Sequence, residues 1–249
     1  MKNKLAVSIL VLFVLSGVFY CYAQADKAAE YMQKVDEVKN PGKDSTGITK
    51  MLLVTADGKE EARKMKVYRM GDKKVYFFLY PPGVEGVAFL SLSDDQMYLY
   101  LPAFKKVRRI ASSAKNENFM GTDMSYEDMT ESSYLEKYVP KIITDKENEV
   151  VLELNKKADA DTSYGKVVLT IDKKTWVRTS IDMYDKNGKL VKKMKCPEVK
   201  MIDNYATTMV VEMTDVQSGH KTKIIMEEVK YDIGLDDDLF SQRRLTRIK

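Results

Sequence analysis

The chain has very few of the side chains on which catalytic and metal sites are usually built. It contains one histidine and two cysteines in 249 residues. His220 lies in a turn-like Ser-Gly-His-Lys sequence and is interpreted as a solvated residue rather than a general base. Cys196 has no cysteine or histidine at zinc-ligand spacing, and the glycine motifs of phosphate, dinucleotide and nucleophile sites are absent. We therefore expect no catalytic residue, no metal and no cofactor, and a protein that is not an enzyme.

Long apolar stretches are also lacking, except near the N-terminus. Lys2 and Lys4 precede an apolar run over residues 5–20, and Ala23-Gln24-Ala25 follows it. A basic start, an apolar centre and an A-x-A site are typical of a cleaved export signal. We expect residues 1–25 to be removed.

The remaining chain, residues 26–249, is predicted to form a single exported domain, because no Pro/Gly/Ser-rich linker divides it. Cys196 is then the sole cysteine, which excludes an intrachain disulfide. Loss of Lys2 and Lys4 lowers the formal charge from +4 to +2. A nearly neutral chain gives no reason to expect nucleic acid as a partner.

Short strand-like runs separated by turns dominate the mature sequence. The clearest turn is Asn187-Gly188, which lies between two alternating runs and is typical of a hairpin. About eleven strands are expected, over residues 47–56, 64–70, 74–80, 87–92, 96–101, 150–154, 165–171, 176–184, 190–195, 207–214 and 223–229. Helices are expected over residues 28–39, 125–138 and 237–247. The second begins with an approximate capping box formed by Ser125 and Asp128.

This pattern predicts a mainly β fold of the α+β class. Consecutive strands joined by tight turns favour one antiparallel meander. A sheet of that width curls, and its concave face then needs a cover. We expect an unclosed antiparallel half-barrel of about eleven strands, with the first two helices lying over its mouth as lids.

Alternation along the strands indicates which side chains face the inside. Methionine is flexible and polarisable and suits surfaces that accept varied apolar shapes, and the mature chain keeps all but Met1 of its 15 methionines. An ordinary packed core is the simpler interpretation of any one strand, but a large curved sheet makes an apolar ligand cavity credible. The candidates for its lining are Met97, Leu99, Leu101, Val177, Ile181, Met183, Met209, Val211 and Met213.

A basic cluster follows the strand that ends near Pro102. Lys106 and Arg108 lie on one face of the extended chain, and Lys105 and Arg109 lie on the other. A segment charged on both faces belongs at a rim. There it is either simply solvated or, as we expect, in contact with anionic lipid headgroups or an acidic protein surface.

An apolar loop follows the basic cluster. Phe119 and Met120, just before Gly121, form either a lid or membrane-touching tip, or side chains folded back onto the core; the sequence does not choose between the two.

These residues carry a resemblance to a known family. The run from Leu99 to Ile110, LYLPAFKKVRRI, followed by Phe119-Met120-Gly121-Thr122-Asp123 and by Ser125-Tyr126-Glu127-Asp128, resembles the signature of the LolA-like outer-membrane lipoprotein-sorting proteins. The resemblance covers essentially the whole mature chain. It implies a periplasmic, LolA/LolB-like half-barrel with lid helices over an apolar cavity. A lid-locking arginine of better-known carriers could correspond to Arg69, Arg108 or Arg109.

The family resemblance implies a carrier that binds acyl chains of lipoproteins or lipids and transfers them towards the outer membrane. Its partners would be an inner-membrane transporter and an outer-membrane acceptor, and we expect it to act as a monomer. One alternative is a periplasmic sensor or partner-binding domain that detects an acylated ligand. Another is a hydrolase with lipid-like substrates, although no sequence motif points to one.

Overall fold

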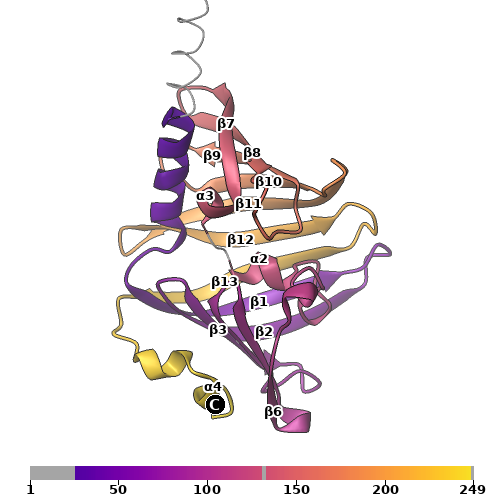
Figure 1. Ribbon diagram of the computed structural model, residues 1–249. Helices are drawn as coiled ribbons and strands as arrows, with labels where there is room; N and C mark the ends of the chain where they lie inside the picture. The colour runs from indigo at the N-terminus through magenta and orange to yellow at the C-terminus, as the bar shows by residue number, and fades with distance from the viewer. Residues whose placement is uncertain (1–25, 131–132, 248–249) are drawn as a thin grey trace, which may run out of the picture.

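One antiparallel sheet dominates the computed structural model, which describes residues 26–130 and 133–247 (Figure 1). Its thirteen strands follow the order β6-β5-β4-β3-β2-β1-β13-β12-β11-β10-β9-β8-β7. They are β1 (Asp44–Val54), β2 (Glu60–Met70), β3 (Lys73–Tyr80), β4 (Ala88–Ser93), β5 (Gln96–Leu101), β6 (Lys106–Arg109), β7 (Tyr138–Asp145), β8 (Glu149–Lys156), β9 (Lys166–Asp172), β10 (Arg178–Tyr184), β11 (Leu190–Ile202), β12 (Tyr205–Asp215) and β13 (Lys221–Tyr231). Strands β6 and β7 are the two edges and do not pair with each other, so the sheet curls without closing. The predicted unclosed half-barrel is confirmed.

The strand count exceeds the expected eleven because β6 and β7 were not anticipated. The helix expected over residues 125–138 was wrong beyond its first turn. It is divided into α2 (Tyr126–Thr130) and α3 (Tyr134–Lys137), and β7 begins at Tyr138. Ser133 has an extended backbone (φ −61°, ψ 128°) and stands immediately before α3. Pro140, which favours an extended conformation for the residue before it, agrees with the start of β7 at Tyr138.

The C-terminal helix was also expected to be continuous over residues 237–247. Instead a 3₁₀ turn, η4 (Asp237–Phe240), is followed by the short helix α4 (Gln242–Leu245). Ser241 separates them with an extended backbone (φ −125°, ψ 149°), and its hydroxyl accepts a hydrogen bond from the Arg244 backbone N–H at 3.3 Å. A serine that caps a new helix ends the preceding one.

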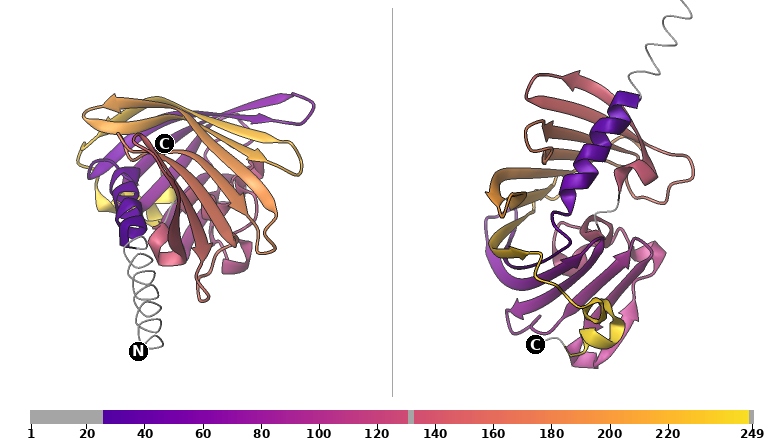
Figure 2. Two further views of the ribbon diagram at one scale, coloured as in Figure 1. Left: turned by 90° about the horizontal axis from the view of Figure 1, so that it is seen from above. Right: turned by 90° about the vertical axis from the view of Figure 1, so that its left-hand side faces the viewer.

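The N-terminal helix is described over residues 26–39 and lies alongside the β7–β11 part of the sheet (Figure 2). Its apolar face buries Ala28, Met32 and Val35 completely or nearly so. The ring of Tyr31 packs against Trp176, with centroids 5.3 Å apart. The helix therefore docks through the 3.6-residue periodicity that predicted it.

The connection from β6 to β7, described over residues 110–130 and 133–137, joins opposite edges of the sheet, and we call these described residues the crossing segment. It runs over the concave face and fills much of that side (Figures 1 and 2). Its Asp123 backbone N–H donates to the hydroxyl of Thr222 in β13 at 2.9 Å, at the middle of the sheet. The topology therefore places the second part of the family-like motif, residues 119–128, on the concave side, whereas its first part forms β5 and the edge strand β6.

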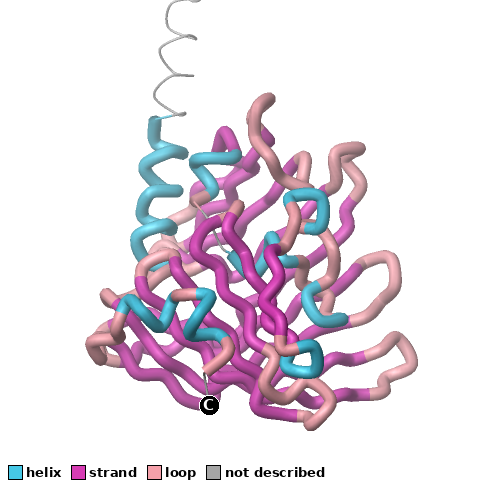
Figure 3. The backbone as a smooth tube through the Cα atoms, turned by 60° about the horizontal axis from the view of Figure 1, so that its bottom comes forward, coloured by secondary structure: helices cyan, strands magenta, loops and turns pink. Residues whose placement is uncertain are grey.

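The sheet is buried on both faces near β3 and β4. On the concave side these strands pack against the crossing segment. On the convex side, Val75 and Phe77 of β3 pack with Phe240 and Leu245 of the C-terminal segment. Figure 3 shows that segment lying against the strands. The candidate site lies on the part of the concave face that the crossing segment does not fill.

Candidate functional site

The sheet has two halves, β1–β6 and β7–β13, which join where β1 pairs with β13. A cavity of about 250 Å³ lies near this junction, between the N-terminal helix and the crossing segment. Val35 and Val38 reach it from the helix, and Val211 and Ile224 reach it from β12 and β13. Met129 of α2 forms part of the opposite wall. The cavity is thus lined by the strands and by the two elements expected to act as lids, and it is partly open to solvent.

Methionines contribute strongly to this lining. Met124 and Met129 come from the crossing segment, Met194 from β11 and Met226 from β13. Unbranched thioether side chains can repack around different apolar shapes. The surface is therefore suited to a flexible apolar ligand.

Four of the nine predicted lining residues lie on cavities. Val177 and Val211 line the large one, whereas Ile181 and Met183 line a neighbouring cavity of about 70 Å³. The two cavities share three lining residues, Asp128, Arg178 and Met194. The two cavities therefore adjoin each other, and Asp128 of α2 lies on both.

The other five predicted residues line neither of these two cavities. Met97, Leu99 and Met213 are buried in the main core, and Leu101 is half-buried against it. Met209 is half-buried on β12. Strand β5 lies far from the junction of the two halves, where the crossing segment already fills the concave side. The assignment of these five residues to a lipid site stays a prediction.

Sequence reasoning missed Met194 and Met226. In β13 the apolar residues run consecutively through Ile224 and Ile225 to Met226, so alternation does not assign a face. The pairing of β1 with β13 also shifts register between Ile48 and Thr49. A bulge of this kind changes which side chains point inward, and no signal in the sequence marks it.

Polar side chains also reach the large cavity. Arg69 and Lys74 are buried and line it. Arg69 donates hydrogen bonds to the backbone carbonyls of Pro41 and Gly42, which follow the N-terminal helix. Of the three arginines considered for a lid contact, Arg69 is therefore next to the helix end, whereas Arg108 and Arg109 lie in β6.

Thr49 provides a different polar group. Its side chain is 3 % exposed and lines the large cavity, and within the described part of the chain its hydroxyl has no hydrogen-bond partner. A buried hydroxyl without a partner is costly. The oxygen itself has almost no accessible surface, so a ligand reaches it only when the lining moves.

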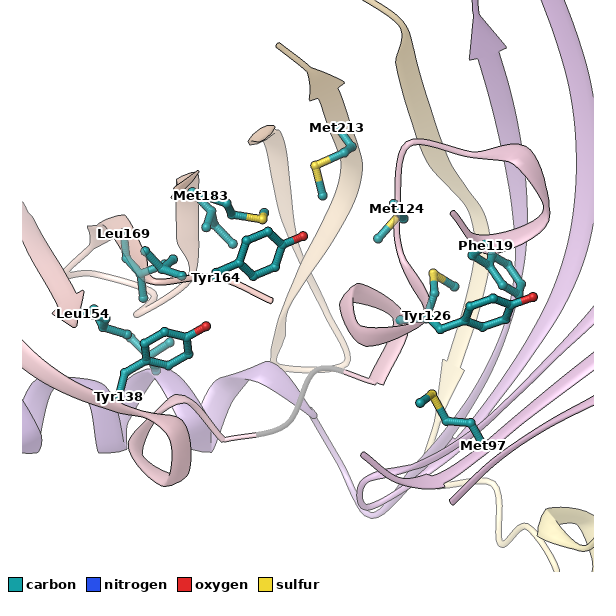
Figure 4. Packing of buried hydrophobic residues seen from close by; sticks show 14 of the residues in the cluster. Met97, Phe119, Met124, Tyr126, Tyr138, Leu154, Tyr164, Leu169, Met183 and Met213 are labelled. Carbon is teal, nitrogen blue, oxygen red and sulfur yellow. The ribbon is translucent and has the colours of Figure 1, made fainter. Parts of the chain in front are cut away.

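Phe119 occupies the centre of an aromatic cluster (Figure 4). It is 0 % exposed, and its ring centroid lies 5.1 Å from Phe89, 5.6 Å from Tyr126 and 5.9 Å from Phe78. The structure thus places this side chain on the core and not at an exposed tip. A lid role for the segment around it stays a prediction.

The residues after Phe119 make a tight turn against β2. Met120 is half-buried with φ 50°, and its carbonyl accepts a hydrogen bond from the buried guanidinium of Arg63. Gly121 follows with φ 78°, a conformation that glycine adopts without steric cost. The turn anchors the apolar end of the crossing segment to the sheet.

The predicted capping box at α2 is confirmed. The Ser125 backbone N–H donates to Asp128 at 2.7 Å, and the Asp128 N–H donates to the Ser125 hydroxyl at 3.1 Å. Asp128 also accepts from Lys192 of β11 and from the hydroxyl of Tyr164, each at 2.8 Å. Burial, together with the Asp128 charge, raises the pKa of Tyr164 well above its usual value. This buried carboxylate joins the crossing segment to the second half of the sheet.

The outer end of the N-terminal helix is held by one carboxylate. Asp145 accepts hydrogen bonds from Lys173 at 2.9 Å, Lys27 at 2.8 Å and the Tyr31 hydroxyl at 3.2 Å. The hydrogen bonds from Lys173 and then from Lys27 lower the pKa of Asp145 to about 2. The helix is therefore docked through apolar packing along its length and through charge at its outer end.

The basic cluster lies away from the cavity, on the edge strand β6 and the turn before it. Lys105, Lys106, Arg108 and Arg109 are all exposed. Arg109 donates to the backbone carbonyl of Asp95 at 2.8 Å. None of these four side chains lines either of the two apolar cavities, although β6 pairs with β5, which carries the predicted residues Leu99 and Leu101.

Two classes of site have no counterpart in residues 26–130 and 133–247. None of the helices there combines the length and the apolar character that a membrane crossing requires. Nor do three histidine, cysteine or acidic side chains gather there in a way that could hold a metal ion. The signal predicted over residues 1–25 lies outside the described residues.

Comparison with known proteins places this geometry in context. A family model described as "Uncharacterized protein" matches residues 71–247. An outer membrane lipoprotein-sorting protein domain from Vibrio parahaemolyticus is 30 % identical and has a TM-score of 0.82, with 90 % of this chain and 100 % of that one covered. No curated protein matches the sequence.

Two further solved structures share the fold. A DUF1329 family protein from Desulfovibrio piger is 28 % identical with a TM-score of 0.84, covering 89 % of this chain and 99 % of its own. A LolA superfamily protein from Nitrosomonas europaea is 18 % identical with a TM-score of 0.72, covering 87 % and 98 %. The latter likeness concerns the fold alone.

Proposed function

Because this chain belongs to the LolA-like family of outer-membrane lipoprotein-sorting proteins, we propose that it is a periplasmic carrier of acyl chains. It takes up the acyl chains of a lipoprotein or lipid and passes them towards the outer membrane. The observation that carries this proposal is the methionine-rich cavity under the N-terminal helix. Transfer of this kind needs no cofactor, since it exchanges one apolar environment for another.

The cavity dimensions support uptake coupled to movement of the cover. Its 250 Å³ is slightly below the range of roughly 300–1,000 Å³ that is usual for small-molecule sites. Each methylene removed from water contributes about 0.8 kcal/mol. Displacement of the N-terminal helix, whose Val35 and Val38 form part of the wall, would lengthen the space for a longer chain. Gly42 and the Arg69 contacts just after the helix mark where it would pivot.

The polar lining suggests how the non-hydrocarbon part of the cargo is held. The Thr49 hydroxyl would donate to an ester or amide carbonyl at the head of the acyl chain. Arg69 and Lys74 add positive charge to the same cavity. The cargo we propose is therefore an acylated molecule with a carbonyl near its head, rather than a plain hydrocarbon.

Native mass spectrometry of the mature protein, purified without detergent and then extracted with solvent, tests this proposal. We expect copurified lipid or acylated peptide, or uptake of a fluorescent fatty acid when it is added. Val211→Trp, which fills the cavity, should weaken the uptake by about tenfold. Met201→Trp, at a 63 % exposed position on β11, is the matched control. A clean apo mass with no uptake by the wild-type protein would reject the proposal.

Transfer between labelled donor and acceptor vesicles then separates a carrier from a sensor. A carrier speeds the transfer of its cargo in proportion to protein concentration. A protein that binds the acyl ligand without accelerating transfer would instead be the sensor considered above. Turnover of an ester lipid would assign the protein to the hydrolases.

A further inference from the structure

We propose that the turn between β5 and β6 is a membrane-docking tip that inserts Phe104 among the headgroups of an anionic bilayer. Phe104 ends the 3₁₀ turn η1 (Pro102–Phe104) and is 70 % exposed, the highest value among the large apolar side chains of the described residues. Lys105 follows in the left-handed conformation (φ 49°) and turns the chain sharply back. The turn thus projects the Phe104 side chain into solvent, where it takes no part in the packing of the core.

A second aromatic residue lies at the same end of the sheet. Tyr80, at the end of β3, is 54 % exposed. The turn after it contacts η1, because a Cβ placed on Gly86 would lie 3.4 Å from Cγ of Pro102. Two hairpin ends in contact therefore each expose an aromatic ring. Aromatic side chains favour the headgroup level of a membrane, where one part of the ring is apolar and its surroundings are wet.

The charges at this end match an anionic surface. Lys105 and Lys106 directly follow Phe104, and Arg108 lies two residues further along the exposed edge strand. Residues 102–109 contain no acidic side chain. Glu85, in the turn that contacts η1, is a nearby exposed acid, so the positive charge prevails. Near an anionic leaflet each such cation strengthens binding by about fivefold.

This arrangement favours a lipid surface over a folded protein partner. The tip presents a projecting ring with cations behind it, which is the combination that interfacial segments use. Phe119, the apolar residue that follows the basic cluster in sequence, is buried and cannot serve this purpose, whereas Phe104 is free to do so. The exposed tip could dock on a membrane whether or not the protein is a carrier. Its role in delivering cargo to a membrane, however, rests on the carrier proposal.

Vesicle sedimentation of the mature protein tests the docking tip. The vesicles contain phosphatidylglycerol and phosphatidylethanolamine in one series, and phosphatidylcholine alone in the other. We expect binding to the first series only, weakened by salt. Phe104→Ser and the double variant Lys105→Glu/Lys106→Glu should each weaken it by about tenfold or more, whereas Met201→Ser should not. Emission of a Phe104→Trp variant, measured against wild type, should shift to shorter wavelength on the anionic vesicles.

The outcomes separate this inference from the proposed function. Absence of binding to the anionic vesicles, or equal weakening by Met201→Ser, would overturn the docking tip and leave an acidic protein surface as the partner of the cations. Acyl uptake measured on the same variants should stay at the wild-type level. Vesicle binding without any acyl uptake would support the docking tip and reject the carrier. Acyl uptake without vesicle binding would support the carrier and reject the docking tip.

Discussion

Replacement of Phe119 by alanine should strongly destabilise the protein, because, of the two places that the sequence left open for this side chain, an exposed tip or the core, it occupies the core. The side chain is 0 % exposed and packs with four aromatic rings of the concave core, those of Tyr76, Phe78, Phe89 and Tyr126. Truncation of a buried phenylalanine costs about 3–5 kcal/mol, the sum of lost transfer energy and the cavity left behind. For a chain of this size, that loss corresponds to a fall in Tm of about 6–20 °C.

Urea unfolding of the mature protein, followed by circular dichroism, measures this effect directly. Phe104→Ala is the matched control, since it removes the same side chain from a 70 % exposed site only fifteen residues earlier. Its effect should stay within about 0.5 kcal/mol. If Phe119→Ala cost less than about 1 kcal/mol, the crossing segment would not be anchored as described, and a loosely held lid would explain the motif better.

Three further changes test other contacts. Asp128→Asn should cost about 3 kcal/mol in urea unfolding, because it leaves the buried ammonium of Lys192 without its carboxylate; an unchanged midpoint would show that the two halves of the sheet are joined by other contacts. The depressed pKa of Asp145, about 2 in the folded protein against about 3.9 unfolded, stabilises the fold fully above pH 4. That contribution should disappear as the pH falls from 4 to 2, so wild type and Asp145→Asn should converge over this window, and a constant difference would contradict the assignment. Gly42→Ala should cost about 1–2 kcal/mol at a φ of +72°, and more if the new Cβ, 2.9 Å from Asp232, cannot be relieved; thermal unfolding with no loss would show that this pivot is not constrained.

Local signals in the sequence predicted much of the architecture. Alternation and turn chemistry located eleven of the strands, and helical periodicity located the N-terminal helix with its buried face. The Ser125–Asp128 capping box was predicted correctly because both partners are three residues apart on one short segment. Such features depend on neighbours in the chain, which is why the sequence displays them.

The sequence was less informative where distant residues compete. The expected helices over residues 125–138 and 237–247 were each interrupted. In both, a serine with an extended backbone, Ser133 or Ser241, stands immediately before a new short helix. The predicted apolar lining divided between core and cavity, since alternation gives the face of a strand but not what covers it. Met226 was missed because β13 contains an extra residue, Glu227, between the partners of Ile48 and Thr49, and this shifts which side chains face inward.

By itself the sequence determined that the chain builds a wide antiparallel meander with an amphipathic helix and an exposed basic edge, since each of these follows from local periodicity and charge. Only the tertiary structure decided what fills the concave side. Because β6 and β7 lie at opposite edges, the crossing segment must span the sheet. This carries Phe119 into the core, leaves a methionine-lined cavity under the N-terminal helix, and leaves Phe104 as the exposed ring beside the cations. No local pattern contains that information, since it arises from the order in which thirteen strands are joined.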